Sequence, residues 1–277
     1  MTDPRERCRV VIRKIVARFE SNACRALHDR PDVPIPELGE LVRCLAEIEA
    51  IDEHAVRWDP LSWSKGFASQ TRLPEPGRLQ DAVARLAEAT ERPGGKWIVR
   101  RGDVFELGRG DVIELFLATM AWGYGRGWGW WRTAQIIEHA GQPSAGGDQL
   151  QPLIDKLNHL ANLARSGPTT DLFSAWSDAT HVARLVGLGP AFATKFAYFA
   201  GYDRQTGRGP LIADLLVAWA MWALADVWDV RHEAPCYAEY LAVASRWAEA
   251  YGCRPDEVER ALFSIGPAIR AARNASR

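Results

Sequence analysis

The sequence predicts a mainly α-helical fold of two lobes, with at most one short β-hairpin. Apolar residues recur at helical spacing through most of the 277-residue chain. Only residues 96–107 alternate in the manner of a strand pair, with a turn at residues 101–103. The polar residues 142–148, which include Gly and Pro, divide an N-terminal lobe, residues 1–145, from a C-terminal lobe, residues 146–277. We expect the two lobes to form one compact unit.

Three kinds of sequence pattern predict the elements of the N-terminal lobe. In residues 5–19, arginines alternate with apolar residues, which predicts an amphipathic helix rather than a signal segment. Residues 59–77 contain three prolines and two glycines, which favours an ordered surface loop. Residues 79–86 and 112–122 place apolar side chains at intervals of three and four, so each predicts a helix with a buried face.

The composition is that of an ordinary soluble protein, with 47% apolar and 25% charged residues. No uncharged run is longer than residues 215–225, which are too few to span a bilayer, so we expect a cytoplasmic protein without a membrane partner. The five cysteines form no CxxC pair and no ligand spacing for zinc or an iron–sulfur cluster. They are typical of reduced thiols, and we expect neither a metal nor a cofactor.

The charge balance gives no global argument for nucleic-acid binding, because the formal net charge is −1. Backbone N–H groups and a few arginines on one face can nevertheless hold phosphates. Of the 34 basic residues only five are lysines. A lysine in an apolar segment is therefore conspicuous.

Residues 171–201 predict two helices joined by a hairpin. The first helix is expected to end at about Val186, the residues Gly187-Leu188-Gly189-Pro190 follow, and the second helix ends at Gly201. The glycines permit a tight turn, and N–H groups at the start of the second helix can hold a phosphate. An ordinary turn between two helices is the alternative.

Two lone charges flank the polar loop that follows the hairpin. Lys195 is the only charged residue of the second hairpin helix, and Asp214 is the only one of an apolar helix predicted at residues 211–225. Burial lowers the pKa of a lysine and leaves a neutral amine that can attack carbon. An aspartate can stabilise positive charge that develops on a sugar. The alternatives are that Lys195 extends its ammonium to solvent and that Asp214 only caps its helix.

These segments resemble the helix-hairpin-helix DNA glycosylases, and within them the 8-oxoguanine DNA glycosylase branch with the OGG fold. The resemblance rests on VGLGPAFATKFAYFAG (residues 186–201), PLIADLLVA (residues 210–218) and EVERALFSIG (residues 257–266). The separation of 19 positions between the lysine and the aspartate is also similar to that of the family. The N-terminal half resembles the family only loosely, through WSKGFASQ (residues 63–70) and MAWGYGRGWGWWR (residues 120–132).

The resemblance implies roles for ten residues. The catalytic pair would be Lys195 and Asp214, the DNA-binding hairpin would be Gly187, Leu188, Gly189 and Ala191, and the base pocket would be Glu259, Phe263, Trp63 and Trp122. In that pocket Phe263 would stack on an extruded base and Glu259 would face its hydrogen-bonding edge. A carboxylate only accepts hydrogen bonds, so Glu259 suits an edge rich in N–H groups, such as a guanine or cytosine face. The usual family lysine stands where this chain has Ala191, and Lys195 lies one helical turn later.

The implied partner is double-stranded DNA that contains a modified base, bound by a monomer. If Lys195 forms a Schiff base with the sugar, the enzyme also cleaves the strand as an AP lyase. If Lys195 is structural, Asp214 orients a water molecule and the enzyme is monofunctional. Three alternatives stay open: an antiviral glycosylase for hypermodified phage bases, a hairpin module that binds DNA without catalysis, and a helical protein with no role on DNA.

Overall fold

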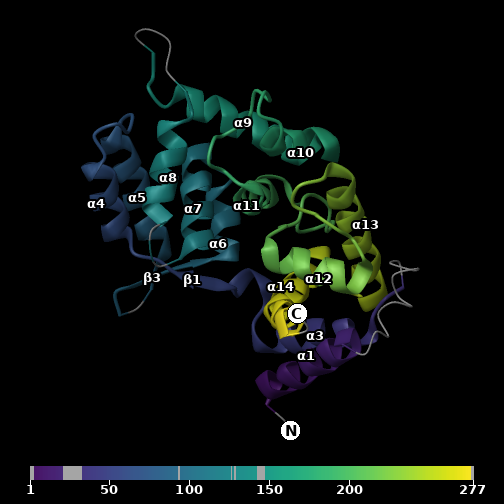
Figure 1. Ribbon diagram of the computed structural model, residues 1–277. Helices are drawn as coiled ribbons and strands as arrows, with labels where there is room; N and C mark the ends of the chain where they lie inside the picture. Colours follow the sequence, from purple (N-terminus) through teal and green to yellow (C-terminus); the bar gives the residue numbers. More distant parts are fainter. Residues whose placement is uncertain are drawn as a thin grey trace. The chain divides into compact units, whose positions relative to one another are not determined.

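The computed structural model describes residues 3–20, 33–92, 94–125, 127, 129–141 and 147–275, and it is mainly α-helical, as the sequence predicts (Figure 1). These residues pack into two units, which we call the terminal unit (Met1–Ile51 with Tyr202–Arg277) and the middle unit (Asp52–Gly201). The units differ from the predicted lobes, because the first helices pack with the last ones. The expected lobe border falls largely on residues 142–146, which lie outside the described residues.

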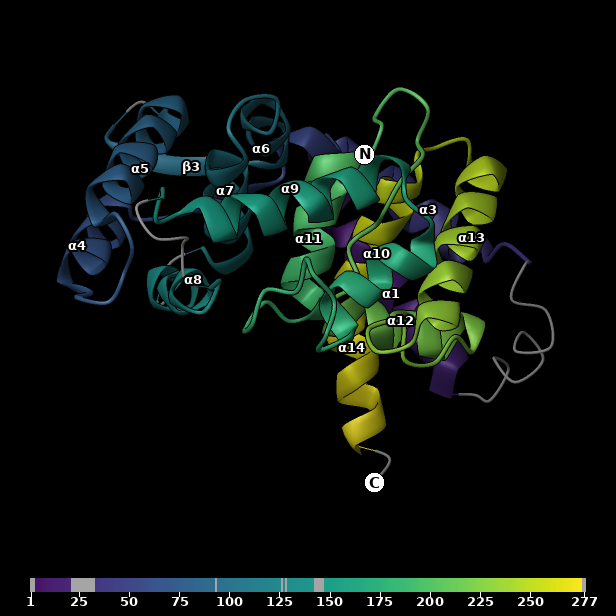
Figure 2. The ribbon, with the colours of Figure 1, turned by 90° about the horizontal axis from the view of Figure 1, so that it is seen from above.

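The terminal unit is built around its last helix, α14. Figure 2 shows this helix among the other four, and it packs against each of them. The amphipathic helix expected at residues 5–19 is confirmed as α1, which buries Cys8, Val11 and Ile15. The helices of this unit are α1 (Pro4–Glu20), α3 (Pro36–Ile48), α12 (Leu215–Ala225), α13 (Ala234–Tyr251) and α14 (Pro255–Ala275).

Two close contacts fix the helices of the terminal unit. A Cβ atom at Gly266 of α14 would lie 2.5 Å from the carbonyl oxygen of Leu216 in α12, so only glycine allows this approach. At the other contact, the Tyr251 hydroxyl donates a hydrogen bond to the carbonyl of Ile35 and accepts one from its N–H, both at 2.8 Å. The first turn of α12 and the start of α3 are therefore anchored to the C-terminal helices.

The middle unit is organised around α7, which packs against α5, α6, α8, α9 and α11. The approach of α11 is close, because a Cβ atom at Gly123 of α7 would lie 2.4 Å from the Phe192 ring of α11. The helices predicted at residues 79–86 and 112–122 are confirmed as α5 and α7. The helices of this unit are α4 (Pro60–Ser69), α5 (Pro76–Thr90), α6 (Arg101–Leu107), α7 (Val112–Tyr124), α8 (Gly129–Glu138), α9 (Gln151–Ser166), α10 (Thr169–Ser177) and α11 (Pro190–Gly201).

A small antiparallel sheet completes the middle unit, with strand order β1-β3-β2. Its strands are β1 (Ala55–Arg57), β2 (Glu91–Arg92) and β3 (Lys96–Arg100), and the 3-10 helix η1 (Ile51–Glu53) precedes β1. The prediction of a strand pair within residues 96–107 is half wrong, because the second half forms α6. The Asp103 side chain accepts a hydrogen bond from the N–H of Arg100 at 2.9 Å and so favours a helix start over a hairpin turn.

The surface loop expected at residues 59–77 is also wrong in part, because α4 occupies most of it. Pro60 stands in the first helical turn, and the Asp59 side chain caps the helix by accepting a hydrogen bond from the N–H of Ser62 at 3.2 Å. Proline at the first helical position starts a helix rather than ending one. The next helix, α5, also has a proline, Pro76, at its first position.

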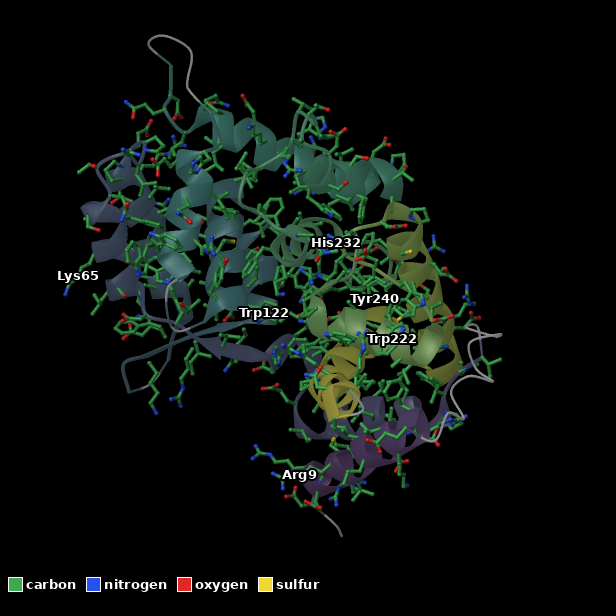
Figure 3. All side chains as sticks on the ribbon, viewed as in Figure 1. Arg9, Lys65, Trp122, Trp222, His232 and Tyr240 are labelled. Carbon is green, nitrogen blue, oxygen red and sulfur yellow. The ribbon has the colours of Figure 1, made fainter. Side chains whose placement is uncertain are left out.

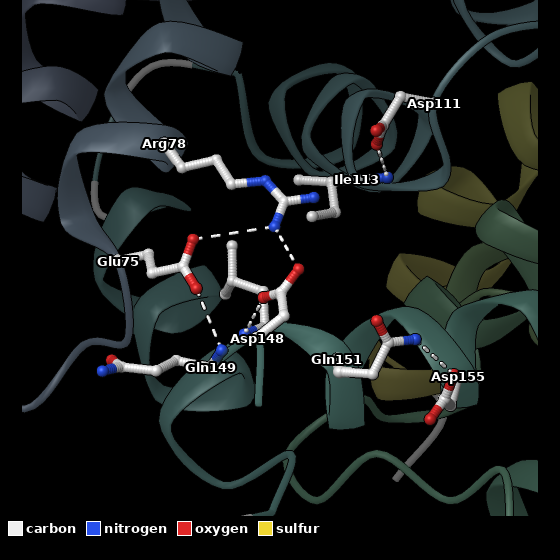
Figure 4. A network of polar contacts seen from close by, with 9 residues as sticks. Glu75, Arg78, Asp111, Ile113, Asp148, Gln149, Gln151 and Asp155 are labelled. Carbon is white, nitrogen blue, oxygen red and sulfur yellow. Dashed lines mark hydrogen bonds and ion pairs between the residues drawn. The ribbon is translucent and has the colours of Figure 1, made fainter. Parts of the chain in front are cut away.

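A polar network joins the start of α5 to the start of α9 (Figure 4). The Arg78 guanidinium lies 2.6 Å from an oxygen of Asp148 and 3.6 Å from one of Glu75. The second Asp148 oxygen accepts the N–H of Leu150 at 2.8 Å, and Glu75 accepts the N–H of Gln149 at 2.9 Å. The hydrogen bond from Arg78, followed by that from Leu150, holds the pKa of Asp148 below its usual range.

We expect Arg78→Ala to make the stability of the protein less sensitive to acid. The pKa of Asp148 is lower in the folded protein than the unfolded value of about 3.9, so the ionised carboxylate stabilises the fold above that pH. This contribution is lost as the pH falls through the lower, folded pKa. Urea unfolding at pH 7 and pH 3 measures it, with Lys65→Ala as the control because Lys65 lies outside the network. Equal pH dependence of the two variants would contradict the expected role of the ion pair.

Candidate functional site

The hairpin segment lies in the middle unit and has a shorter first helix than expected. α10 ends at Ser177 rather than near Val186, and turns fill residues 178–189. The Asp178 side chain accepts hydrogen bonds from the N–H and the hydroxyl of Thr180, both at 2.8 Å, which competes with helical bonding. The guanidinium of Arg184 then donates to the carbonyl of Ser177 at 3.0 Å and satisfies the helix end.

The expected tight turn lies directly before α11. Gly187 has a φ of +88°, which favours glycine, and the N–H of Leu188 donates to the carbonyl of Leu185 at 3.1 Å. Leu188 is buried, which anchors the turn. In the described part of the chain, the N–H groups of Gly187, Gly189 and Ala191 donate to no protein acceptor. Three N–H donors therefore surround the N-terminus of a 12-residue helix.

Lys195 is buried in α11, with 8% of its surface exposed. Its Nζ atom lies 5.4 Å from the centre of the Phe192 ring, and the neighbouring Thr194 and Phe196 are also buried. Most of this residue is therefore covered by protein. Its chemical role stays a prediction.

Trp122 packs within the middle unit beside a buried cation that the sequence patterns did not reveal. The guanidinium of Arg101 lies 5.2 Å from the centre of the Trp122 ring and 5.1 Å from that of Tyr198. The indole N–H of Trp122, which Figure 3 labels, donates to the carbonyl of His54 at 3.3 Å. Phe199 of α11 lies against the same ring, with centroids 5.3 Å apart. A role for Trp122 at a base pocket stays a prediction.

Asp214 belongs to the terminal unit, where it caps α12. The predicted helix at residues 211–225 begins only at Leu215, because residues 211–214 form no regular structure and Asp214 itself has an extended backbone. The Asp214 Oδ1 atom accepts hydrogen bonds from the N–H groups of Leu216 and Val217, both at 3.0 Å. Both of these capping bonds end on the same carboxylate oxygen.

Two buried tyrosines of α13 position the segment that ends at Asp214. The Tyr237 hydroxyl donates to the carbonyl of Leu211 at 2.8 Å, and the Tyr240 hydroxyl, labelled in Figure 3, donates to that of Ile212 at 3.0 Å. Burial raises the pKa of Tyr237 well above its usual value, so its hydroxyl remains a donor at neutral pH. These bonds join residues 26 and 28 positions apart, which no local sequence pattern indicates.

Glu259 and Phe263 share one face of α14 with Gly266, because intervals of four and three residues return to the same side of a helix. Gly266 contacts Leu216 in the first turn of α12, the turn that Asp214 caps. Glu259 is 2% exposed, whereas 37% of the Phe263 surface is exposed. Gly266, on this face of α14, therefore lies beside the first turn of α12.

Trp63 lines a cavity of about 670 Å³ in the middle unit. Neither Trp122 nor any hairpin residue lines it. In the sequence, only two segments rich in Gly and Trp, residues 63–70 and 120–132, pointed to this cavity. Most of its lining residues lie outside these segments. The lining consists of Arg57, Trp58, Asp59, Ser62, Trp63, Gly95, Lys96, Trp97, Gly125, Gly127 and Trp130.

No helix of the described residues combines the length and the apolar character needed to cross a membrane. No three His, Cys, Asp or Glu side chains in this part of the chain lie close enough together to hold a metal ion.

Comparison with known proteins identifies one family. The family model described as "Putative 8-oxoguanine DNA glycosylase OGG-like protein" matches residues 49–263. The matched range includes the hairpin, Lys195, Asp214, Glu259 and Phe263. No curated protein and no solved structure matches the chain.

Proposed function

The chain belongs to the OGG-like family of putative 8-oxoguanine DNA glycosylases, and we propose that it excises a modified base from double-stranded DNA as a monomer. The observation that carries this proposal is the extent of the family match. The matched range includes Lys195 and Asp214, the hairpin, and the face of α14 that bears Glu259 and Phe263. The arrangement of polar groups within each unit is consistent with it.

The hairpin supplies a neutral way to hold a DNA phosphate. The N–H groups of Gly187, Gly189 and Ala191 are the donors, and the N-terminus of α11 adds a favourable dipole. Such contacts position the protein on DNA without reading its sequence. They also fit a chain whose net charge is −1.

Alanine substitutions at the two hairpin glycines distinguish an effect on folding from an effect on DNA binding. A Cβ atom at Gly189 would meet nothing within 4 Å, so Gly189→Ala should fold normally and place a methyl group among the N–H donors. Gly187 has a positive φ, so Gly187→Ala should in addition lower the free energy of unfolding by about 1 kcal/mol or more.

Fluorescence anisotropy with labelled duplex DNA and thermal unfolding measure the two effects. We expect Gly189→Ala to bind DNA several-fold more weakly at an unchanged melting temperature. Unchanged DNA affinity in both variants would contradict the proposed contact.

Glu259 and Phe263 are proposed to receive the extruded base. Flipping a nucleotide out of the duplex costs a few kcal/mol, and stacking on an aromatic ring offsets part of this cost. The exposed Phe263 ring is suited to stacking, and the Glu259 carboxylate accepts N–H groups of the base edge. Since 8-oxoguanine keeps the N–H donors of guanine on that edge, it is the first substrate to test.

Asp214 is proposed to stabilise positive charge on the deoxyribose while the glycosidic bond breaks. Capping fixes the carboxylate at the start of α12, and the two α13 tyrosines fix the backbone before it. A carboxylate held in place in this way needs no reorganisation when the charge develops.

Lys195 is proposed as the nucleophile. The neutral Nζ forms a bond to C1′ as the bond from C1′ to the base breaks, and the electron pair leaves with the base, which takes up a proton. Nζ then loses a proton, and the ring opens as the C1′–O4′ bond breaks and O4′ takes up a proton. The resulting Schiff base permits loss of a C2′ proton, with which the C3′–O bond breaks and the 3′ phosphate leaves. If water attacks C1′ instead, Asp214 orients it and the enzyme is monofunctional.

The test is a panel of duplex oligonucleotides, each with one modified base, incubated with the protein and analysed with and without alkali. Alkali cleaves abasic sites, so product seen only with alkali indicates a monofunctional enzyme, and product seen without it indicates lyase activity. The panel includes hypermodified phage bases, whose preferential release would assign the antiviral role. No abasic site on any duplex would contradict the proposed function.

A further inference from the structure

The cavity of the middle unit is lined by aromatic rings and bordered by two cations, and we propose that it binds one unpaired nucleotide through its base and its phosphate. This inference rests on the proposed function, because the DNA substrate supplies the nucleotide. Glu259 and Phe263, which are assigned to the extruded base, do not line this cavity. The volume of about 670 Å³ lies in the range of roughly 300–1,000 Å³ typical of small-molecule sites.

The aromatic walls are rigid. Trp58 and Trp63 are almost fully buried, with ring centroids 5.9 Å apart and planes at 81°, and they form the inner part of the wall. Trp58 is held by a hydrogen bond from its indole N–H to Thr90 at 3.1 Å. Trp97 and Trp130 are partly exposed and complete the lining. Rings of this kind receive a base by stacking, and they do so for every base because each has a flat face.

Trp130 is fixed by the backbone of α4. A Cβ atom at Gly66 would lie 2.3 Å from the Trp130 ring, so the ring lies directly on the glycine. An aromatic wall that is held in place before a ligand arrives loses little conformational entropy on binding. The glycine and the tryptophan therefore make a preformed surface rather than a flexible one.

The charges at the cavity favour an anion. In the sheet, Arg57 pairs with Ile98, and Ile98 lies two positions after Lys96, so both cations project from one face of the sheet. Both are exposed. Among the described residues of the lining, Asp59 is the one carboxylate, and it accepts the N–H of Ser62 as the cap of α4. One negative and two positive side chains therefore give the described lining a net charge of +1.

The combination of rings and cations selects the ligand class. A purely apolar ligand would gain nothing from Arg57 and Lys96, and a cationic ligand would be repelled by them. A nucleotide presents a flat ring and a phosphate at a short separation, and it satisfies both features. The partly exposed tryptophans accept the base, and the two cations hold the phosphate.

The experiment measures binding of a short, fluorescein-labelled, single-stranded oligonucleotide and of an abasic oligonucleotide of equal length by fluorescence anisotropy. The variants are Trp97→Ala and the double substitution of Arg57 and Lys96 by alanine. The matched control is Lys65→Ala, because Lys65 is an exposed cation of α4 that does not line the cavity (Figure 3). Thermal unfolding checks that each variant folds, and the double variant changes only exposed side chains.

We expect Trp97→Ala to weaken binding of the oligonucleotide that carries bases at least about five-fold, the lower end of the cost of losing one base–aromatic stack, and to leave binding of the abasic strand unchanged. The double variant should reduce the slope of log affinity against log salt by about one. Competition with free deoxyadenosine monophosphate shows whether the cavity takes a free nucleotide or one within a strand. Displacement of the labelled oligonucleotide supports a free nucleotide, and failure to displace it supports a nucleotide within the strand.

Binding by both variants equal to that of Lys65→Ala would overturn the inference, as would equal binding of the two oligonucleotides by the unmodified protein. Base release from modified duplexes, measured on the same preparations, separates this inference from the proposed function. If the protein releases base and the cavity variants bind single strands normally, only the cavity assignment is overturned. If the protein releases no base and the cavity variants lose single-strand binding, the cavity assignment is supported and the proposed function is overturned.

Discussion

Asp214→Asn is expected to lower base excision at least about 100-fold while DNA binding stays nearly unchanged. The asparagine keeps the shape of the side chain and can still cap α12, because its amide oxygen accepts the N–H groups of Leu216 and Val217. The substitution therefore removes mainly the negative charge. Single-turnover rates on a modified duplex, with anisotropy for DNA affinity, measure the effect.

Asp214→Ala is the matched control for the structural role of this residue. It removes both the charge and the cap, so it should lose about 1 kcal/mol of stability that Asp214→Asn retains. Near-normal turnover in the asparagine variant would show that the catalytic carboxylate lies elsewhere. A similar loss of stability in both variants would show instead that the charge of Asp214 is needed for folding.

Lys195→Ala is expected to abolish the covalent adduct that borohydride traps during turnover. Reduction converts a Schiff base between the protein and the sugar into a stable amine, so protein and DNA migrate together on a denaturing gel. Strand cleavage without alkali should disappear in the same variant. Both effects follow if the buried amine of α11 is the group that reaches C1′.

Lys195→Met controls for packing, because methionine fills much of the volume that alanine would leave empty beside Phe192. Loss of the adduct in both variants, with unchanged melting of the methionine variant, would assign the chemistry to the amine. An adduct that persists in both variants would place the nucleophile elsewhere. Base release without any adduct in the unmodified protein would leave the reaction to Asp214 and water.

The amphipathic helices were predictable, because their signal is local. In α1, Cys8, Val11 and Ile15 recur at intervals of three and four, and this spacing alone places them on one buried face. The tight turn at Gly187 was predictable for a similar reason, since a second glycine follows two residues later and a proline stands at the start of the next helix.

The helix ends were not predictable, because side chains that are distant in the sequence determine them. The start of α12 moves to Leu215 because tyrosines of α13 hold the carbonyls of Leu211 and Ile212. The early end of α10 depends on Arg184, whose guanidinium binds carbonyls seven and eight residues before it. The apolar periodicity of the sequence continues past the start of α12 and the end of α10, and it does not indicate these hydrogen bonds.

The cavity was also beyond local reasoning. Its tryptophans come from four different places: the residue after β1, the helices α4 and α8, and the strand β3. The alternation within residues 96–107 predicted that this segment pairs with itself, whereas β3 pairs with β1 and β2, so Arg57 and Lys96 were not expected on one face. Only the sheet register shows that they are neighbours.

Mass-spectrometric detection of free base released from a duplex with one 8-oxoguanine tests the central claim most directly. With enzyme in excess over DNA, we predict free 8-oxoguanine and an equal amount of abasic or cleaved strand, with both products strongly reduced in Asp214→Asn. The absence of free base from this duplex and from every other modified duplex, although the protein binds the same DNA, would contradict the account. The protein would then be a DNA-binding module without glycosylase activity.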